Sequence, residues 1–466
     1  MPSTRKGGPG PAAALLLCGA LFAFAVGFVA GDQDWIPPRY VVPAKDFIKG
    51  WIPVAPPPAM SSRTVATGHL LLDIGEVPVT VRREGAGGGL TSAGTELLLL
   101  THEGTIHRVD GTSVRPTAIE PPDNGYAAYE AASRSDRFND LTHNLRWFRY
   151  NDILYFENAE GASLAVSYTE WHAAAECYTT TVARLDLGRS PPSMAGVQAG
   201  PDDWTILFRT RPCLPLKRSM RALEGHMAGG RLAFAPPATI VLGSGDYHWD
   251  GVYAPEALAQ NPRNDYGKVI DINARTGESA HLSVGNRNVQ GLVLDSSGRL
   301  WGVEHGPRGG DELNRILPGS NHGWPLTTLG TGYDEMPWPG TEAYGRHSGF
   351  DAPVFAWLPS IGISNITEVM GFDPTWDGDL LVASLKAGSL FRVRVREDHV
   401  EFVEPIPVGQ PIRYVHQHTD GRIVAWTDEH RLLFLSRSEV TPAAARLDKL
   451  IGEQDLTARR RAALST

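Results

Sequence analysis

Hydrophobic and polar residues alternate in short segments between about residue 63 and residue 436 of the chain. In each segment the alternation continues on both sides of a tight turn, which in most cases ends in Gly. A period of two is typical of a β-strand with one buried face, and two such runs around an xG turn predict a β-hairpin. Six hairpins are predicted, over residues 97–110, 153–169, 232–245, 292–305, 380–395 and 415–435.

Six hairpins at uneven spacing indicate an all-β fold, a six-bladed β-propeller with long loop insertions. Each blade of a propeller is a small antiparallel sheet that must pack against its neighbours. The 50 Gly and 35 Pro, with only 20% charged residues, also suit a turn-rich β protein better than a helical one. A β-sandwich is the alternative, but a single sandwich seldom needs a chain of this length.

The N-terminal region is typical of an export signal. Residues 12–30 form an unbroken apolar run that follows Arg5 and Lys6, and a helix of that length spans roughly 28 Å of hydrocarbon. Positive charges before such a run predict that the remainder of the chain is exported. Cleavage after Ala30 would place the bulky Phe28 at the −3 position. We therefore favour a transmembrane signal anchor over a cleaved signal peptide for residues 1–31, with the domain on the periplasmic or cell-surface side.

The flanks of the predicted propeller differ from it in composition. Residues 32–62 are rich in Pro and predict a stiff tether between the membrane and the domain. The propeller is expected over residues 63–436. Thr441 and Pro442 form a helix start, and the chain ends on a basic segment, so residues 437–466 predict a short helical, basic tail.

Cys177 and Cys213 are the cysteines that lie beyond the predicted anchor. Disulfides persist in exported compartments, and closing this loop would stabilise the fold by about 3–4 kcal/mol on the chain-entropy model. Two buried free thiols are the alternative. The chain carries no C-x-x-C-H sequence, which excludes a c-type haem attachment site.

The formal net charge of −9 bears on the class of partner. Proteins that bind nucleic acids need basic surfaces to neutralise phosphates. An acidic chain of this kind therefore argues against a nucleic-acid partner.

The most informative part of the chain is a strand flanked by two polar loops. The loops read GNRNVQGL over residues 285–292 and EHGPRGGDELN over residues 304–314, and PGSNHGWP follows over residues 318–325. Propellers present polar groups of this kind at the mouth of their central channel. Turn formation and ion pairs between blades are the structural alternative.

These three segments resemble the signature of the soluble quinoprotein glucose/sorbosone dehydrogenase family. That family typically has a G-H-R-N-P-Q-G loop, then E-H-G-P-x-G-G-D-E, then a G-x-N-Y-G-W-P turn. The resemblance extends from roughly residue 141 to residue 435. It implies oxidation of an aldose-type sugar or related alcohol outside the cytoplasm, with pyrroloquinoline quinone (PQQ) and Ca²⁺ as cofactors and an electron acceptor in the membrane or periplasm.

The resemblance also implies roles for four residues of the two loops. Arg287 is expected to stabilise the negative charge that develops on the quinone oxygen, because its guanidinium is permanently charged. Asn288 is expected to hold the cofactor by a hydrogen bond. The backbone carbonyls of Gly306 and Pro307 are expected to bind Ca²⁺, which requires hard oxygen ligands.

Three further residues are assigned by position in the family pattern. Lys386 matches a lysine that meets a carboxylate of the quinone, and Arg413 matches the second arginine of a pair that does the same. Pro411 stands where the first arginine of that pair belongs. His226, before the strand that starts at Arg231, matches the general base that accepts the hydroxyl proton while hydride passes to the quinone. His226 lies one residue farther from Arg231 than is usual, and His143 is the next candidate base.

Two other functions fit the same scaffold. A non-catalytic propeller that binds a glycan or a protein in the same cleft is the alternative to the enzyme. A calcium-dependent sugar lactonase is a third and weaker one, because the sequence shows no matching set of inward carboxylates. The sequence names neither the sugar nor the electron acceptor.

Overall fold

A computed structural model of the chain describes residues 62–111, 113–134, 142–189, 193–216, 227–341 and 345–439. The predicted anchor, the predicted tether up to residue 61, the tail from residue 440, His226 and the side chain of His143 lie outside the described residues. Among the helices that the structure describes, none is long and apolar enough to cross a membrane. The described residues contain one α-helix, α3 (Tyr126–Ser133), and many β-strands.

Within the described ranges, the strands form six sheets of four or five strands and one small parallel pair, β7 (Ala118–Ile119) with β11 (Gln198–Ala199). The first three large sheets are β3 (Gly88–Ala93), β4 (Glu96–Thr101), β5 (Ile106–Asp110) and β6 (Ser113–Pro116); β8 (Tyr150–Asn158), β9 (Gly161–His172), β10 (Cys177–Gly188), β12 (Thr205–Arg209) and β13 (Leu214–Pro215); and β14 (Gly229–Ala235), β15 (Thr239–Ser244), β16 (Lys268–Asn273), β17 (Ser279–Val284) and β21 (Ser320–Asn321).

The other three sheets follow in chain order, and the last one also takes in the first strands of the domain. They are β18 (Val289–Leu294), β19 (Leu300–Glu304), β20 (Asp311–Arg315) and β22 (Phe355–Trp357); β23 (Ile363–Glu368), β24 (Leu380–Ser384), β25 (Ser389–Arg396) and β26 (His399–Pro407); and β27 (Ile412–Gln417), β28 (Ile423–Thr427), β29 (Arg431–Arg437), β2 (Leu71–Pro78) and β1 (Ser62–Ala66).

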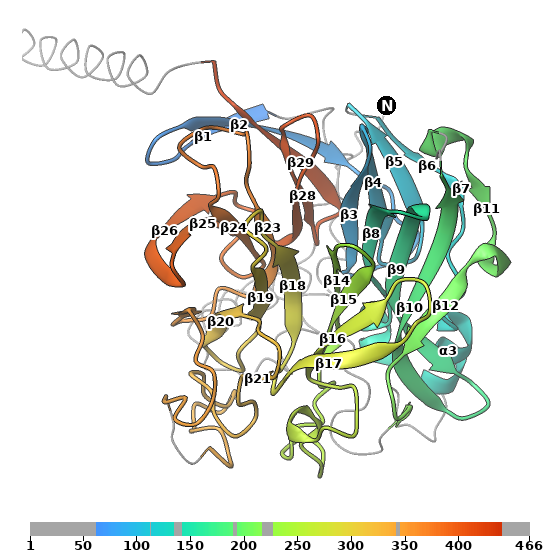
Figure 1. The fold of residues 1–466 in the computed structure, drawn as a ribbon, viewed down its shortest axis with the longest axis vertical. Helices are drawn as coiled ribbons and strands as arrows, with labels where there is room; N and C mark the ends of the chain where they lie inside the picture. Colours follow the sequence, from blue (N-terminus) through green and yellow to red (C-terminus); the bar gives the residue numbers. More distant parts are fainter. Residues whose placement is uncertain are drawn as a thin grey trace, which may run out of the picture. The chain divides into compact units, whose positions relative to one another are not determined.

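The six sheets are the blades of a propeller. The first strand of each blade packs against the first strand of the next, in the order β3, β8, β14, β18, β23 and β27, and β27 packs against β3 to close the ring. The predicted all-β six-bladed propeller is therefore confirmed, and the sandwich alternative is wrong. Figure 1 shows the blades following one another in chain order around the centre.

The last blade joins the two ends of the propeller. β2 pairs antiparallel with β29, from Leu72 opposite Arg437 to Pro78 opposite Arg431, and Figure 1 shows the blue β2 beside the red β29. Leu72 and Ile74 of β2 are fully buried in a hydrophobic cluster that also contains residues of β24, β27 and β28. Strands from the start of the domain thus complete its last blade, which ties the two ends of the domain together.

We call the strands that pack against one another around the ring the inner strands; they are β3, β8, β14, β18, β23 and β27. The inner strands begin at one end of the central channel. Arg231 of β14 is fully buried and donates hydrogen bonds to backbone carbonyl oxygens in four other blades. These acceptors, at 2.8–3.5 Å, are Gly88, Asn151, Gln290 and Arg413. Each of them is the first or second residue of its own inner strand, so five inner strands begin at the same end. We call this end the mouth.

Five of the six inner strands share an irregularity at the mouth. The pairing register with the second strand shifts at their second residue, which is Asn151, Gly230, Gln290, Ser364 or Arg413. A β-bulge of this kind releases one residue from the ladder and bends the strand. The same local device in successive blades therefore frees one residue per blade beside the channel.

The predicted disulfide is present. Cys177, the first residue of β10, is bonded to Cys213, and their Cα atoms are 5.6 Å apart. The bond ties β10 to the segment that leads into β13, which pairs with the same end of β10. The alternative of two free thiols is therefore wrong.

Candidate active site

Arg287 lies two residues before the start of β18, at the mouth, and its side chain is buried. Nη1 donates hydrogen bonds to the carbonyl oxygens of His305 (3.1 Å) and Gly306 (2.9 Å), and Cζ lies 5.1 Å from the centroid of the Trp324 ring. Neither Nε nor Nη2 has a hydrogen-bond partner among the described residues, although both are buried. Because buried donors are costly when unsatisfied, these two nitrogens are suited to bind an oxygen of a ligand.

Glu304, at the end of β19, holds the backbone around Arg287. Its Oε2 accepts hydrogen bonds from the backbone N–H groups of Arg287 (2.5 Å) and Asn288 (3.4 Å), and its Oε1 accepts from the side-chain amides of Asn286 and Asn314. Burial raises the pKa of Glu304, and these hydrogen bonds offset part of that rise. The carboxyl group thus fixes the loop that carries Arg287 and Asn288.

The turn after β19 brings backbone carbonyls together. A Cβ atom added to Gly306 would lie 2.1 Å from the carbonyl oxygen of Gly309 and 2.4 Å from that of Gly310, so only glycine fits there. Pro307 follows and is buried. In the part of the chain that the structure describes, no group of three or more His, Cys, Asp or Glu side chains is placed to hold a metal ion. The family resemblance places the expected Ca²⁺ ligands on the backbone carbonyl oxygens of Gly306 and Pro307 in this turn.

Asp311 links this turn to the fifth blade. Its Oδ1 accepts a hydrogen bond from the backbone N–H of Gly306 (3.2 Å), and its Oδ2 accepts from those of Gly362 (2.8 Å) and Ile363 (3.0 Å). Burial raises the pKa of Asp311, but hydrogen bonds and the charge of His305 outweigh it, so that the pKa lies below its usual value. The carboxylate of Asp311 thus joins the turn that carries the expected Ca²⁺ ligands to the start of β23.

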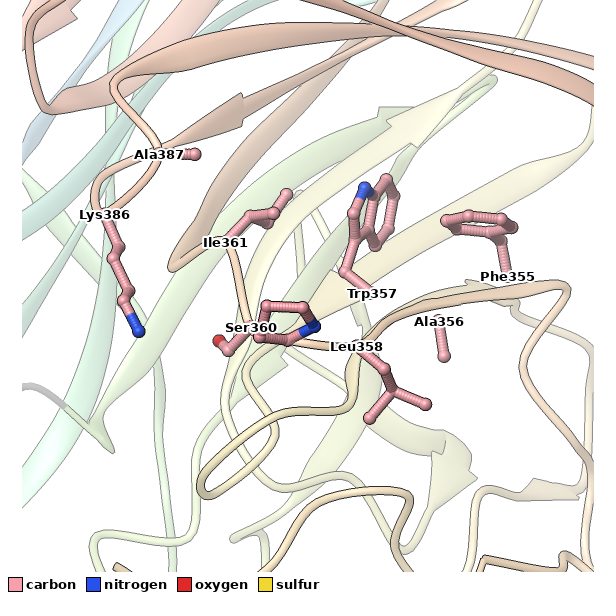
Figure 2. Close-up of a pocket in the computed structure, with 9 residues that line it drawn as sticks. Phe355, Ala356, Trp357, Leu358, Ser360, Ile361, Lys386 and Ala387 are labelled. Carbon is pink, nitrogen blue, oxygen red and sulfur yellow. The ribbon is translucent and has the colours of Figure 1, made fainter.

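Lys386 lies on the turn after β24 and is exposed. The turn is held by hydrogen bonds from the N–H of Leu385 to the carbonyl oxygen of Gly362 (2.7 Å) and from the N–H of Ala387 to that of Ile361 (3.0 Å). Lys386 lines a cavity of about 480 Å³ together with Ala387 and residues 355–361. In Figure 2, Lys386 and Ser360 lie toward one end of this cavity and Leu358 and Phe355 toward the other. The cavity therefore has a cationic end and an apolar end.

Arg413 and Asn288 make contacts that hold the mouth together. The guanidinium of Arg413 forms a two-point ion pair with Asp428, at 2.8 Å and 2.6 Å, and its Nη1 lies 3.5 Å from the side-chain oxygen of Gln290. The side-chain oxygen of Asn288 accepts hydrogen bonds from the amide of Gln290 (2.8 Å) and from the N–H of Gly229 (3.1 Å). Gln290 thus connects two of the predicted cofactor residues.

The structure places the described residues of the predicted site at the mouth, beside two separate cavities. Arg287 and Gly306 line one small cavity, and Lys386 lines the larger one. All the predicted residues except His226 lie at the mouth, at the start of an inner strand or just after a second strand. His226 lies outside the described residues, and the chain resumes at the mouth with Met227, whose carbonyl oxygen accepts a hydrogen bond from the N–H of Tyr247.

Asp246 is a residue of this site that the sequence pattern did not single out. Its backbone N–H donates to the carbonyl oxygen of Arg287 (3.0 Å), and its Oδ2 accepts a hydrogen bond from Trp324 Nε1 (2.7 Å). Burial and the charge of Asp250 raise the pKa of Asp246 to about 6. The predicted hairpin ended at Gly245, one residue beyond the end of β15 and directly before Asp246. The signal that could have found Asp246 is its position just after a second strand, which it shares with His305.

Comparisons with known proteins agree with the fold and with the loops. A family model described as glucose/sorbosone dehydrogenase matches residues 153–434. The aldose sugar dehydrogenase YliI of Escherichia coli is 32% identical over 239 residues, which cover 49% of this chain and 62% of the relative. An uncharacterized protein of Synechocystis, slr1608, is 31% identical over 249 residues, which cover 49% of this chain and 58% of that protein. The chain thus spans about three fifths of the length of these curated relatives.

Solved structures show the same fold. The apo-form of the soluble aldose sugar dehydrogenase from Escherichia coli superimposes with a TM-score of 0.61 at 23% identity, over 78% of this chain and all of that one. The PQQ-bound aldose sugar dehydrogenase from Streptomyces coelicolor gives a TM-score of 0.52 at 21% identity, over 82% of this chain and all of that one. At these identities the likeness establishes the architecture alone.

Proposed function

Because this chain belongs to the glucose/sorbosone dehydrogenase family, we propose that it oxidises an aldose-type sugar or a related alcohol with PQQ as its cofactor. The observation that carries this proposal is Arg287, a buried guanidinium at the mouth with two donor nitrogens that no described residue satisfies. A quinone oxygen is the kind of acceptor that such a group binds, and a fixed positive charge there stabilises negative charge as it develops.

The residues at the mouth fit the cofactor in chemical type. Lys386 offers an ammonium group to a carboxylate of the quinone, and the carbonyl oxygens of Gly306 and Pro307 are hard ligands for Ca²⁺. Arg287 uses one lone pair of the Gly306 oxygen, and a carbonyl oxygen has two. Bound PQQ would supply a two-electron acceptor for hydride.

The protein's own residues then have distinct tasks. His226 accepts the proton of the sugar hydroxyl, a role that a neutral imidazole near its usual pKa of about 6.5 can fill at neutral pH. Arg287, fixed by Glu304 and by the carbonyl oxygens of its neighbours, holds its charge at the reacting oxygen. The apolar end of the cavity, with Phe355 and Leu358, offers a surface for the C–H face of a sugar.

We also propose that the domain works outside the cytoplasm, tethered by the N-terminal anchor, and passes electrons to an acceptor in the membrane or periplasm. The apolar run after Arg5 and Lys6 supports this location, and so does the Cys177–Cys213 disulfide, which is typical of oxidising compartments. Fractionation of full-length protein with membranes is the expected result. Recovery of a mature N-terminus near Gly31 would replace anchoring with secretion.

The test of the reaction compares the parent with His226→Ala. Full-length protein reconstituted with Ca²⁺ and PQQ should reduce an artificial dye in the presence of at least one of a panel of aldoses. His226→Ala should bind PQQ as the parent does and lose about 10²–10⁴ in turnover, as expected for the loss of a general base. Near-parental turnover on every aldose would remove His226 from the site and direct attention to His143. No parental binding at micromolar PQQ would favour a glycan- or protein-binding propeller.

A further inference from the structure

Arg149 is a buried arginine at the mouth that has no acidic partner. It lies directly before β8, and its side chain is 1% exposed. Nε donates a hydrogen bond to the side-chain oxygen of Asn151 (3.1 Å), and Nη1 donates to the carbonyl oxygen of Ala86 (2.8 Å). Among the described residues no ion pair with Asp or Glu and no hydrogen bond from Nη2 is found, and Cζ lies 5.5 Å from the centroid of the Trp147 ring. The N–H groups of Nη2 are thus left for another acceptor.

The surroundings of Arg149 are rich in positive charge. Asn151 accepts hydrogen bonds both from Arg149 and, through its backbone, from Arg231. Arg231 donates in turn to the backbone of Arg413, and Arg413 already takes up both oxygens of Asp428. Burial lowers the pKa of Arg149 well below its usual value, the charges of Arg413 and Arg231 lower it further, and Asp428 offsets only part of this. A buried cation in such a place is costly unless an anion joins it.

The backbone beside Arg149 is shaped to admit its side chain. A Cβ atom added to Gly87 would lie 2.6 Å from Cδ of Arg149, so a larger residue there would displace the arginine. The carbonyl oxygen of Gly87 accepts a hydrogen bond from Trp426 Nε1 (2.9 Å), and the carbonyl oxygen of Pro411 accepts one from the N–H of Asp428 (2.9 Å). Trp426 and Asp428 stand two residues apart at the end of β28. These contacts therefore lead from Gly87, beside Arg149, to Pro411 in the sixth blade.

We propose that Arg149 binds a carboxylate of the quinone cofactor and takes the place of the arginine that family members carry where this chain has Pro411. Proline offers no side-chain donor, whereas the planar fork of a guanidinium matches a carboxylate. The inference rests on the proposed function, because it requires that PQQ binds at the mouth. The two arginines that would contact the quinone carboxylates then come from different blades, Arg149 from the second and Arg413 from the sixth.

The test uses the charge of the ligand as well as that of the protein. Three full-length proteins are compared in the presence of Ca²⁺: the parent, Arg149→Gln and Arg149→Lys. Each is titrated with PQQ and with its trimethyl ester, which lacks the carboxylate charges. We expect Arg149→Gln to weaken binding of PQQ about tenfold to a hundredfold, the loss of one charge-assisted contact. The same substitution should change binding of the ester much less. The affinity of Arg149→Lys for PQQ should lie between those of the parent and Arg149→Gln.

Arg184→Gln is the matched control. Arg184 is a partly buried arginine of the same blade, on β10, and donates to the carbonyl oxygen of Ala274 (2.8 Å). This variant should bind both ligands like the parent. The melting temperature of apo Arg149→Gln should not fall below that of the parent, because the substitution removes a buried cation without a counter-ion.

Three results would overturn the inference. Equal losses for PQQ and the ester would make Arg149 a support of the fold, and so would a variant that does not fold. Unchanged affinity for PQQ in Arg149→Gln would remove it from the site. A parent that binds no PQQ would overturn the proposed function itself, whereas a parent that binds PQQ beside an unaffected Arg149→Gln would overturn the inference alone.

Discussion

At the scale of single residues, Arg231 connects more of the propeller than any sequence motif suggested. Its guanidinium reaches backbone oxygens in four other blades. Arg231→Met should lower the free energy of unfolding by about 3–5 kcal/mol, because it leaves several buried carbonyls without donors. Urea denaturation of the protein measures this. The exposed Arg209, which pairs with Glu170, is the control, and Arg209→Met should cost less than about 1 kcal/mol. Equal effects of the two substitutions would contradict the role of Arg231.

Asp246 gives a pH dependence with a definite sign. Its pKa in the folded protein is about 6, above the usual value for Asp of about 3.9, since burial and Asp250 oppose its ionisation. The folded state therefore holds this proton more tightly than the unfolded state does. The stability that results is present below about pH 4 and is lost as the pH rises through about 6.

Asp246→Asn removes this titration. The difference in unfolding free energy, variant minus parent, should increase between pH 4 and pH 7 by up to about 3 kcal/mol in favour of the variant. Denaturation curves at pH 4, 5, 6 and 7 measure it. A difference that stays constant over this range would show that Asp246 titrates normally.

Most of the proposed site could be predicted from the sequence because its residues stand in ordered motifs, whereas Arg149 could not, and Asp246 was marked only by its position after a second strand. Arg149 follows a segment without a turn or loop motif, and nothing in the local sequence shows that its charge is buried without an acid. Asp246 directly follows Gly243-Ser244-Gly245, but nothing in this local sequence shows that its carboxyl group is buried against Trp324. Their roles depend on contacts with other blades, which no local pattern encodes.

At the scale of elements, the predicted hairpins correspond to real ones but not always to the same pair of strands. In the second, third and fourth blades the prediction found the first and second strands, as in β8 and β9. In the sixth blade the range 415–435 covered all of β28 and parts of β27 and β29. In the first and fifth blades it found the second and third, β4 with β5 and β24 with β25. The inner strands β3 and β23 were missed because GGLTSA and ISNITE show no regular alternation of apolar and polar residues.

The disulfide is the element whose removal is easiest to measure. Cys177 and Cys213 are separated by 36 residues, and loss of a native disulfide over a loop of this size costs about 2–5 kcal/mol. The Cys177→Ser/Cys213→Ser double variant should therefore unfold at a lower urea concentration than the parent. Peptide mapping without reduction should link the two cysteines. Two freely alkylated thiols in unfolded, unreduced protein would contradict the structure.

At the scale of the whole molecule, the propeller explains how residues far apart in the chain come to lie at one end of the channel. Arg149, Asp246, Arg287, Lys386 and Arg413 come from five blades, and each lies at the start of an inner strand or just after a second strand. Because the inner strands begin at the same end, equivalent positions in successive blades meet at the mouth. The propeller fold alone therefore predicts that these positions lie at the same end of the channel. The distances between their side chains could be read only from the structure.

The central claim is that this mouth binds PQQ through Arg287, and one titration tests it most directly. PQQ is added to full-length parent and to Arg287→Ala in Ca²⁺, and binding is followed by the change in protein fluorescence. The parent should show saturable binding in the micromolar range or below, and Arg287→Ala should bind at least about tenfold more weakly, since a charged hydrogen-bonding partner is lost. Absence of saturable binding by the parent, or equal affinities of the two proteins, would contradict the account.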